Sequence, residues 1–472
     1  MAFFFTLLFL TTAYLTPTLL FGQLGQYHVV LLFAVLAFLA SIPGLVKSGV
    51  GKLPQVYAVL GLAVMVVLST AKHWLGGIPG ALEDFLPVTA AFFLTAINVR
   101  KPWQIKLLVL ALFLGSVFFI AHGAYDLNNN IIPSPFLYTQ EAVPRLRGLG
   151  VVNDPNDLAQ VLVSLIPLVF LWRTRSVVVN IFLLGIPVAV LVTGMFLTHS
   201  RGSSIALMVI VMVAFRRKIG TVPAVILASL LLAGVLAAGW GAGRDVSLEG
   251  GAERLDAWAT GINFIKHNPV LGIGYQQFKE ENYITAHNSV VVCAAENGIP
   301  GFLCWVLFVF SSFRFSMKLD PKKDDKLEAE GASTALPPPR FGPPGAAGLQ
   351  PQHFWAARRS PAVQGATPLP APTSAAAAAP AVSLDELHRM ARLMMIAVTG
   401  FLTAGWFLSR AISIWLFMYC GLVCALMRMA RDNGWEVPRD RWPFLLRWTA
   451  IIGFLLILLV YVILRVRNIV GH

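Results

Sequence analysis

Residues 83–121 read EDFLPVTAAFFLTAINVRKPWQIKLLVLALFLGSVFFIA, two apolar runs joined by the basic turn Arg100-Lys101-Pro102. A helix needs about 20 apolar residues to cross the hydrocarbon core of a bilayer. Such runs recur along the chain, which is 57% hydrophobic and only 12% charged. No soluble core could hide so much apolar surface in 472 residues. The composition therefore excludes a soluble enzyme and a disordered chain, and indicates a protein partly solvated by lipid.

The apolar runs predict an all-α polytopic membrane protein with about 12 (12–13) transmembrane helices. An odd number would place the C-terminal Arg465 and Arg467 on the outer side, against the charge rule given below. The predicted spans lie near residues 2–20, 28–46, 53–71, 83–99, 103–121, 155–172, 177–198, 202–215, 221–240, 288–313, 390–408, 411–427 and 444–464.

The net charge of +13 is distributed as short basic clusters between the apolar runs, in every second loop. This is the positive-inside pattern of membrane proteins, so we expect membrane lipids and no nucleic acid as partners. With the basic loops in the cytoplasm, the N-terminus is inside. The segments 72–82, 122–154, 199–201, 241–287 and 409–410 then lie outside.

The chain divides into five predicted parts. Pro- and Ala-rich composition with few large apolar residues cannot repay the entropy of ordering, so one of these parts is expected to be disordered. The parts are transmembrane helices over 1–240, an outer catalytic loop over 241–287, a transmembrane helix over 288–315, a disordered cytoplasmic loop over 316–386 and C-terminal transmembrane helices over 387–472.

Two arginines stand out in the outer segment 122–154. Arg145 and Arg147 are two residues apart, and in an extended segment such residues project to the same side, where both could hold one anion. Solvated loop charge is the alternative. Downstream, Asp154 is a suitable N-cap, Pro155 suits the first helical position and Asp157 complements the positive helix end.

A third arginine, Arg201, begins a helix that enters from outside, where a cation opposes the helix macrodipole. An anion between Arg201 and the free N–H groups would explain this placement, because helix N-termini bind phosphates readily. Snorkelling to lipid headgroups is the alternative.

A fourth, Arg254, begins a stretch with apolar residues at helical spacing, which predicts a short amphipathic helix on the membrane surface. The following Gly272-Ile273-Gly274 predicts a plain turn rather than a phosphate-binding loop. The apolar residues concerned are Leu255, Trp258, Ile262 and Ile265.

His287 precedes a long span that Asn288 can cap. The positive helix end and nearby arginines would lower the pKa of His287, and a neutral imidazole can act as a general base. An isolated histidine is more often structural than catalytic, which is the alternative. Glu296 lies nine residues on, about half a turn around an ideal helix, so it is not an obvious partner of His287. Gly298 and Pro300 are expected to disturb this helix.

All these candidates map to the outer side of the membrane. Arginine suits bidentate contacts with phosphate, and no set of residues has convincing metal-ligand spacing. We therefore expect an anionic ligand neutralised by arginines, with no metal and no cofactor. The predicted site residues are Arg145, Arg147, Arg201, Arg254 and His287, with Asn288, Glu296 and Arg410 as supporting candidates.

The motifs that contain these residues follow one another in an order that resembles the O-antigen ligase and O-antigen polymerase superfamily. The resemblance covers roughly residues 50 to 315. Members of this superfamily are bacterial inner-membrane glycosyltransferases that use undecaprenyl-pyrophosphate-linked glycans. The resemblance is carried by RLRGLGVVNDPNDLAQ (145–160), THSRGSSIAL (198–207), ERLDAWATGINFIKHNPVLGIGYQQF (253–278) and AHNSVVVCAAENGIPGF (286–302).

The resemblance implies an α-helical fold with a large periplasmic loop before His287. It also implies that arginines matching Arg147, Arg201 and Arg254 hold the pyrophosphate. His287 would activate a hydroxyl of lipid A core, of another glycan or of a protein, without metal. A polymerase that joins lipid-linked repeat units is the alternative within this class. An anion transporter is the alternative outside it, and would need charged residues near the midplane and paired broken helices.

Overall fold

The computed structural model describes residues 1–140, 143–237, 248–319, 382–435 and 437–470. Residues 1–320 and 384–472 form one compact unit, and residues 321–383 are a second. Apart from Val382 and Ser383, that second unit lies outside the described residues. The predicted disordered loop over 316–386 therefore falls almost entirely outside them. So does the start of the predicted outer loop, residues 241–247.

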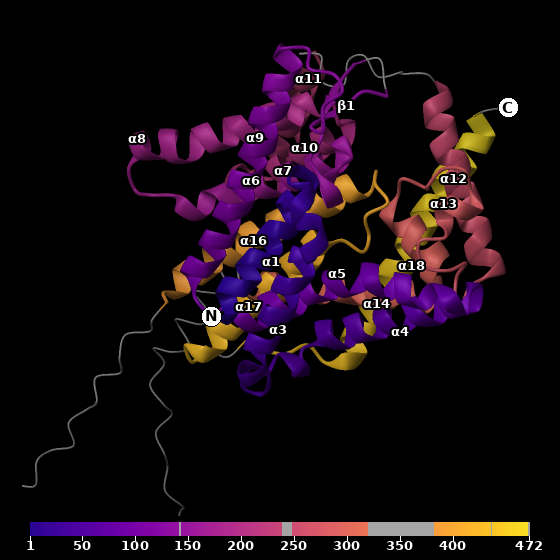
Figure 1. Ribbon diagram of the computed structural model, residues 1–472, viewed down its shortest axis with the longest axis horizontal. Helices are drawn as coiled ribbons and strands as arrows, with labels where there is room; N and C mark the ends of the chain where they lie inside the picture. The colour runs from indigo at the N-terminus through magenta and orange to yellow at the C-terminus, as the bar shows by residue number, and fades with distance from the viewer. Residues whose placement is uncertain (141–142, 238–247, 320–381, 436, 471–472) are drawn as a thin grey trace, which may run out of the picture. The chain divides into compact units, whose positions relative to one another are not determined.

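The described chain is almost entirely helical (Figure 1). Its only strands form a two-stranded antiparallel hairpin, with β1 (Leu137–Tyr138) paired to β2 (Arg145–Leu146). The α-helices are α1 (Ala2–Leu15), α2 (Pro17–Leu20), α3 (Val29–Ser48), α4 (Pro54–His73), α5 (Ile78–Asn98), α6 (Pro102–Asn128), α7 (Pro155–Val169), α8 (Val177–Asn180), α9 (Ile186–Leu197), α10 (Arg201–Ile219), α11 (Thr221–Ala237), α12 (Leu248–His267), α13 (Phe278–Glu281), α14 (Ser289–Lys318), α16 (Leu384–Gly405), α17 (Ile414–Asp432) and α18 (Trp442–Val470). Shorter helical segments are η1 (Gly22–Tyr27), η2 (Val50–Lys52), η3 (Leu75–Gly77), η4 (Gly150–Val152), η5 (Phe170–Trp172) and η6 (Ile181–Gly185).

Within the described ranges, eight helices are long and apolar enough to cross a membrane, and three shorter apolar helices accompany them. The all-α membrane architecture is thus confirmed, whereas the number of crossings stays a prediction. One predicted span is interrupted. The run over 2–20 breaks at Thr16, whose φ is 44°, and resumes as α2 at Pro17. Proline has no N–H with which to continue the hydrogen-bond ladder of α1.

The ends of the helices gather at two opposite faces. One of these faces carries Arg428 and Arg431, and we call it the basic face. There, Arg428 Nη1 donates to the Ile97 carbonyl oxygen (2.7 Å), and Arg431 Nη2 donates to the Ser48 carbonyl oxygen (3.1 Å). The His287 face is the other end, where Lys72 Nζ donates to the Gly272 carbonyl oxygen (3.0 Å).

The first helix begins at the basic face, and the last helix ends near α12 (Figure 1). Phe3 packs edge-on against Trp103, next to the basic turn at the start of α6. At the end of α18, Arg467 forms an ion pair with Asp256 of α12 (2.6 Å). The predicted conflict with the charge rule is eased because Asp256 neutralises Arg467.

The packing centre is α17, which is buried along almost its whole length and lies against α5 and α16. Buried polar groups join neighbouring helices, as in other membrane bundles. Asn98 Nδ2 donates to Thr6 Oγ1 (2.9 Å) and Ser41 Oγ (2.7 Å), which links α5 to α1 and α3.

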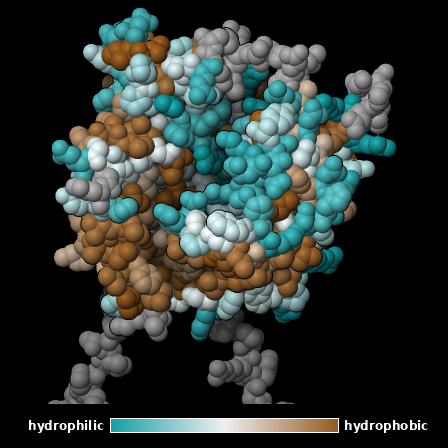
Figure 2. Space-filling model, turned by 45° about the vertical axis from the view of Figure 1, so that its right-hand side comes forward, coloured by the Kyte–Doolittle hydropathy of each residue, from teal (hydrophilic) through white to brown (hydrophobic). Residues whose placement is uncertain are grey.

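The peripheral helices instead expose large apolar side chains. Figure 2 shows a broad hydrophobic area with a hydrophilic area above it. That apolar surface is what a bilayer would cover.

The contact between α17 and α5 depends on Gly421. A Cβ atom there would overlap Thr95 Oγ1 and lie 2.6 Å from the carbonyl oxygen of Phe92. We expect Gly421→Ala to lower the free energy of unfolding by about 1–3 kcal/mol, because the backbone of α5 must move. Gly234→Ala is the control, since nothing lies within 4 Å of a Cβ at that position of α11. Thermal unfolding in detergent measures both; equal melting temperatures would contradict the close contact.

Candidate functional site

His287 stands directly before α14, in a backbone conformation that L-residues rarely adopt. Its φ is 47°, in the left-handed region, where a non-glycine residue is uncommon and costs free energy. Asn288 caps the helix as predicted, since its Oδ1 accepts from the backbone N–H groups of Val290 (2.9 Å) and Val291 (3.1 Å). The imidazole is therefore held at the N-terminus of α14 by a fixed cap.

Ten residues into this helix, α14 breaks. Gly298 has φ 67° and ψ 177°, and Pro300 follows, so the disturbance predicted from these two residues is confirmed. The loop after α12 takes up the freed backbone groups. Ile299 N–H donates to the Pro269 carbonyl oxygen (2.7 Å), and Ile273 N–H donates to that of Ala295 (2.9 Å).

The Gly272-Ile273-Gly274 turn therefore packs against the backbone of α14, in agreement with the prediction of a plain turn. Gly274 N–H donates to the Glu296 carbonyl oxygen (3.2 Å), and a Cβ on Gly272 would overlap that same peptide. Glu296 is buried, and its Oε1 accepts from the backbone N–H of Phe278 (3.3 Å). The break in α14 thus fixes the position of this carboxyl group.

A cavity of about 510 Å³ opens beside these elements. Its wall is built from the start of α7, the segment before α14, the first half of α14 and the connection between α16 and α17. The lining residues are Asn153, Asp154, Asp157, Tyr275, Gln276, Lys279, Thr285, His287, Val292, Cys293, Glu296, Asn297, Leu408, Ser409, Arg410, Ala411 and Ile412. We call this the His287 cavity.

Arg410 is the principal cation of this wall. Its Nε donates to Asp157 Oδ2 (2.9 Å), and its Nη2 contacts the same oxygen. Burial would lower the pKa of Arg410, but the charge of Asp157 outweighs burial and holds that pKa above its ordinary value. Arg410 therefore stays cationic, with part of its side chain exposed to the cavity.

The segment 406–410 also joins the other motifs to the cavity. Ser289 Oγ donates to the Leu408 carbonyl oxygen (2.7 Å) and accepts from the Arg410 N–H (3.1 Å). The ring of Trp406 meets that of Trp258 at 6.1 Å, and Trp258 Nε1 donates to the Ala286 carbonyl oxygen (2.8 Å). The predicted amphipathic helix, α12, is thereby packed against the residues that flank His287, with its apolar face on protein rather than on a membrane surface.

The predicted arginines lie around this cavity rather than in its wall. Gly202 contacts Phe407, so the start of α10, with Arg201, adjoins the 406–410 segment. Arg254 lies one turn before Trp258 on α12. Among the described residues that line the His287 cavity, His287, Glu296 and Arg410 are present, and Arg145, Arg147, Arg201 and Arg254 are not.

The side chain of Arg145 is buried and binds other groups of the protein. Its side chain is 2% exposed, its Nε donates to the Thr198 carbonyl oxygen (2.9 Å) and its Nη2 to Asn156 Oδ1 (3.2 Å). These contacts hold the start of α7 against the end of α9. Arg147 is half-buried, and its Nε donates to the Pro135 carbonyl oxygen (3.2 Å). A joint grip of Arg145 and Arg147 on one anion stays a prediction, and the burial of Arg145 weighs against it.

Several wall residues were not singled out as site candidates. The sequence predicts for Asp157 only that it complements the helix dipole. Its neighbour Asp154 caps α7 as predicted, by accepting from the Asn156 N–H (2.7 Å). Lys279 and Tyr275 carried no signal in the sequence beyond their place in an outer loop. Within the described ranges, no group of three or more His, Cys, Asp or Glu side chains could hold a metal ion.

Next to the His287 cavity is an apolar groove of about 330 Å³ between α14, α16 and α18. Of the described residues that line these two spaces, only Arg410 lines both. The groove is otherwise formed by Gln160, Ser289, Val290, Trp305, Val306, Val309, Phe310, Phe313, Phe401, Leu402, Gly405, Trp406, Ile452 and Leu456. A charged cavity thus meets an apolar groove at one guanidinium group.

Comparison with known proteins gives one family. Residues 186–306 match the model of the O-antigen ligase family, a stretch that runs from α9 through α12 into α14 and contains Arg201, Arg254, His287 and Glu296. No curated protein matches the sequence. The family comprises glycosyltransferase-like membrane enzymes that act on lipid-linked glycans and acceptors. The match over residues 186–306 supports the resemblance to the O-antigen ligase and O-antigen polymerase superfamily that the motifs predicted.

Proposed function

We propose that this protein transfers a glycan from undecaprenyl pyrophosphate to an acceptor hydroxyl in the His287 cavity, at the periplasmic face of the bacterial inner membrane. The observation that carries the proposal is the meeting of the His287 cavity and the apolar groove at Arg410. A polyprenyl diphosphate has a matching division, because its charged head is attached to a long apolar chain. The family match over 186–306 supports the same class of donor.

In this proposal, His287 acts as general base. The acceptor oxygen attacks the anomeric carbon, its proton passes to the imidazole, and the bond from that carbon to the diphosphate oxygen breaks. The electron pair leaves on the diphosphate, and the anomeric centre is inverted. Positioned cations lower the barrier by balancing the charge that develops on the leaving group. Neither a metal nor a cofactor enters these steps.

The cations for the diphosphate come from several elements. Arg410 and Lys279 both line the cavity. Arg201 adjoins the connection after α16 at Phe407, and Arg254 lies one turn before Trp258, whose ring meets that of Trp406. We assign the diphosphate to this group of residues, together with Arg147 as the resemblance implies. Asp157 holds Arg410 at the junction of cavity and groove.

The transport alternative finds less support. It requires a charged group near the bilayer midplane and a pair of broken helices. Glu296 lies seven residues after Ser289, which corresponds to roughly 10 Å of helix rise. That places the carboxyl group about 5 Å short of the middle of a span of about 30 Å, so Glu296 approaches the midplane without reaching it.

His287→Ala is expected to lower glycan transfer by about 10²–10⁴-fold, which is the usual contribution of a general base. Alanine is strained at φ 47°, so His287→Asn is a second variant, because asparagine tolerates that conformation and still removes the base. The control is His267→Ala, at the exposed end of α12. Transfer by purified protein is measured alongside protein level, and normal transfer by both His287 variants would exclude the catalytic assignment.

Arg201→Lys is expected to impair transfer severely, because lysine cannot reproduce the bidentate contacts of a guanidinium group with phosphate. Arg216→Lys makes the same change at the other end of α10, on the basic face, and should leave transfer unchanged. The comparison uses initial rates in membranes at equal protein level. Equal rates for the two variants would remove Arg201 from the diphosphate site.

The acceptor decides between ligase and polymerase, and one assay separates them. Purified protein is incubated with undecaprenyl-pyrophosphate glycan and either lipid A core or a second lipid-linked unit. A single mobility shift of lipid A core is the expected result for a ligase, and a ladder of products is that for a polymerase. Uptake of the substrate without either product would contradict glycan transfer and support transport.

A further inference from the structure

A second large cavity lies at the basic face and has no part in the proposed transfer. It has a volume of about 920 Å³ and is formed where α3 meets α4, where α14 and α17 end, and where α18 begins. Phe315 lines it near the end of α14, whereas His287 precedes the start of that helix. The two sites are thus separated by most of a membrane-spanning helix, on the order of 35–40 Å at 1.5 Å per residue.

Five cations line this basic cavity. Arg428 is buried and belongs to the wall, because its guanidinium group donates to the carbonyl oxygens of Ile97 and Val99 at the end of α5. Arg431 donates to the Ser48 carbonyl oxygen, but its side chain is still 48% exposed. The remaining three are the exposed side chains of Lys52, Arg439 and Arg441.

Among the described residues, two carboxylates near this cavity are already bound by arginine or lysine side chains. Asp440 accepts from Arg314 (3.1 Å) and Lys318 (3.0 Å), and Asp432 pairs with Arg431 (3.1 Å). In the part of the chain that the structure describes, no carboxylate forms an ion pair with Lys52, Arg439 or Arg441. The described lining holds five cations and one carboxylate, that of Asp440, and a ligand of opposite charge would balance this surplus of positive charge.

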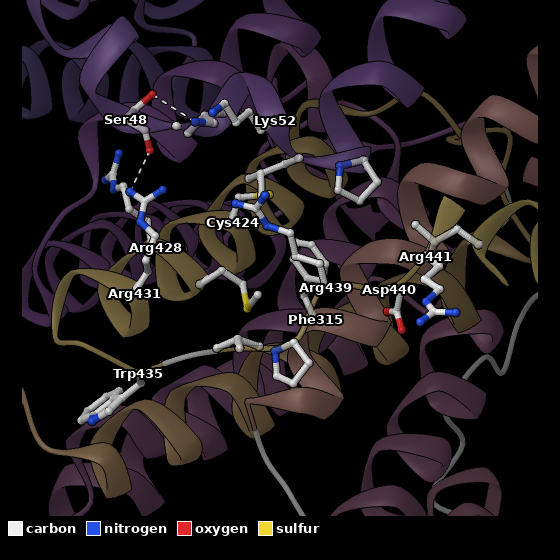
Figure 3. A pocket seen from close by; sticks show the side chains of 18 of the residues that line it. Ser48, Lys52, Phe315, Cys424, Arg428, Arg431, Trp435, Arg439, Asp440 and Arg441 are labelled. Carbon is white, nitrogen blue, oxygen red and sulfur yellow. Dashed lines mark hydrogen bonds between the residues drawn. The ribbon is translucent and has the colours of Figure 1, made fainter. Parts of the chain in front are cut away.

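The cations converge from different elements. Figure 3 shows the guanidinium groups of Arg428, Arg431 and Arg439 pointing toward the turn that carries Ser48 and Lys52, while Arg441 lies on the side of Asp440. Guanidinium groups brought together in this way repel one another in the absence of an anion. A phosphate group could accept hydrogen bonds from several of them at once.

The rest of the wall is apolar or amphipathic. Phe315, Cys424, Met427 and Leu445 line the cavity, and Trp435 and Trp442 stand at its edge. Trp442 meets the ring of Tyr57 at 5.4 Å, which closes the gap between α18 and α4. Tryptophan at such a position is typical of the level of lipid headgroups. Beyond it, α4 and α18 expose apolar side chains, namely Leu60, Val64, Leu446 and Trp448.

We propose that this basic cavity binds the phosphate headgroup of an anionic phospholipid from the leaflet at the basic face, with its acyl chains along α4 and α18. A phosphate with an attached apolar chain fits both the surplus of cations and the apolar edge, whereas free phosphate would leave that edge unused. Basic pockets between transmembrane helices bind anionic headgroups for this reason.

The test is lipid binding by the purified full-length protein in uncharged detergent. Native mass spectrometry follows titration with phosphatidylglycerol, phosphatidylcholine or inorganic phosphate. Wild-type protein is expected to bind phosphatidylglycerol in preference to phosphatidylcholine. The variant Lys52→Gln/Arg439→Gln should bind phosphatidylglycerol about 30-fold more weakly, since two cations near the anionic group are lost.

The matched control is Arg216→Gln/Lys218→Gln, which removes the same charge from exposed positions at the end of α10, outside this cavity. It should bind phosphatidylglycerol as the wild type does, and Lys52→Arg/Arg439→Lys should retain binding. Equal loss in both Gln variants would indicate a general charge effect and overturn the site. Preference for inorganic phosphate, or equal binding of phosphatidylcholine, would overturn the lipid assignment. None of these readouts depends on glycan transfer.

Discussion

The arrangement of the His287 face depends on the satisfaction of backbone hydrogen bonds where α14 breaks. A helix that enters a membrane cannot leave N–H and C=O groups without partners, because lipid offers none. The break at Gly298 is tolerated because the loop after α12 supplies those partners through Pro269, Ile273 and Gly274. This draws the loop after α12 into the helix bundle and places Glu296 and Tyr275 in the wall of the His287 cavity.

A second constraint is the position of the 406–410 segment between α16 and α17. It contacts the starts of α7, α10 and α14 and the middle of α12 through Asp157, Gly202, Ser289 and Trp258. Four motifs far apart in the sequence therefore meet around one short connection. Arg410, which belongs to this connection, is also the point where the charged cavity meets the apolar groove.

The two faces of the protein use arginine differently. At the His287 face, Arg145 is buried and Arg410 is paired with Asp157, so much of the positive charge is held by the protein itself. At the basic face, Arg431 and Arg439 remain exposed around a larger cavity. A cluster of basic residues is therefore not by itself evidence of a phosphate site. Carboxylates and carbonyl oxygens of the protein can already bind these cations, and their number decides how much positive charge is left for a ligand.

The sequence by itself determined the features that depend on neighbouring residues. Apolar runs of membrane length, the Asp154 and Asn288 caps, the helix over Leu255 to Ile265 and the disturbance at Gly298 could all be predicted, since each follows from local periodicity or backbone chemistry. Only the tertiary structure decided that Glu296 and Arg410 share a cavity with His287, that Arg145 is buried and that Lys52 lies across a cavity from Arg439. Most of these relations join residues that are far apart in the sequence, and they are set by which helices pack together, a property that no single stretch of sequence contains.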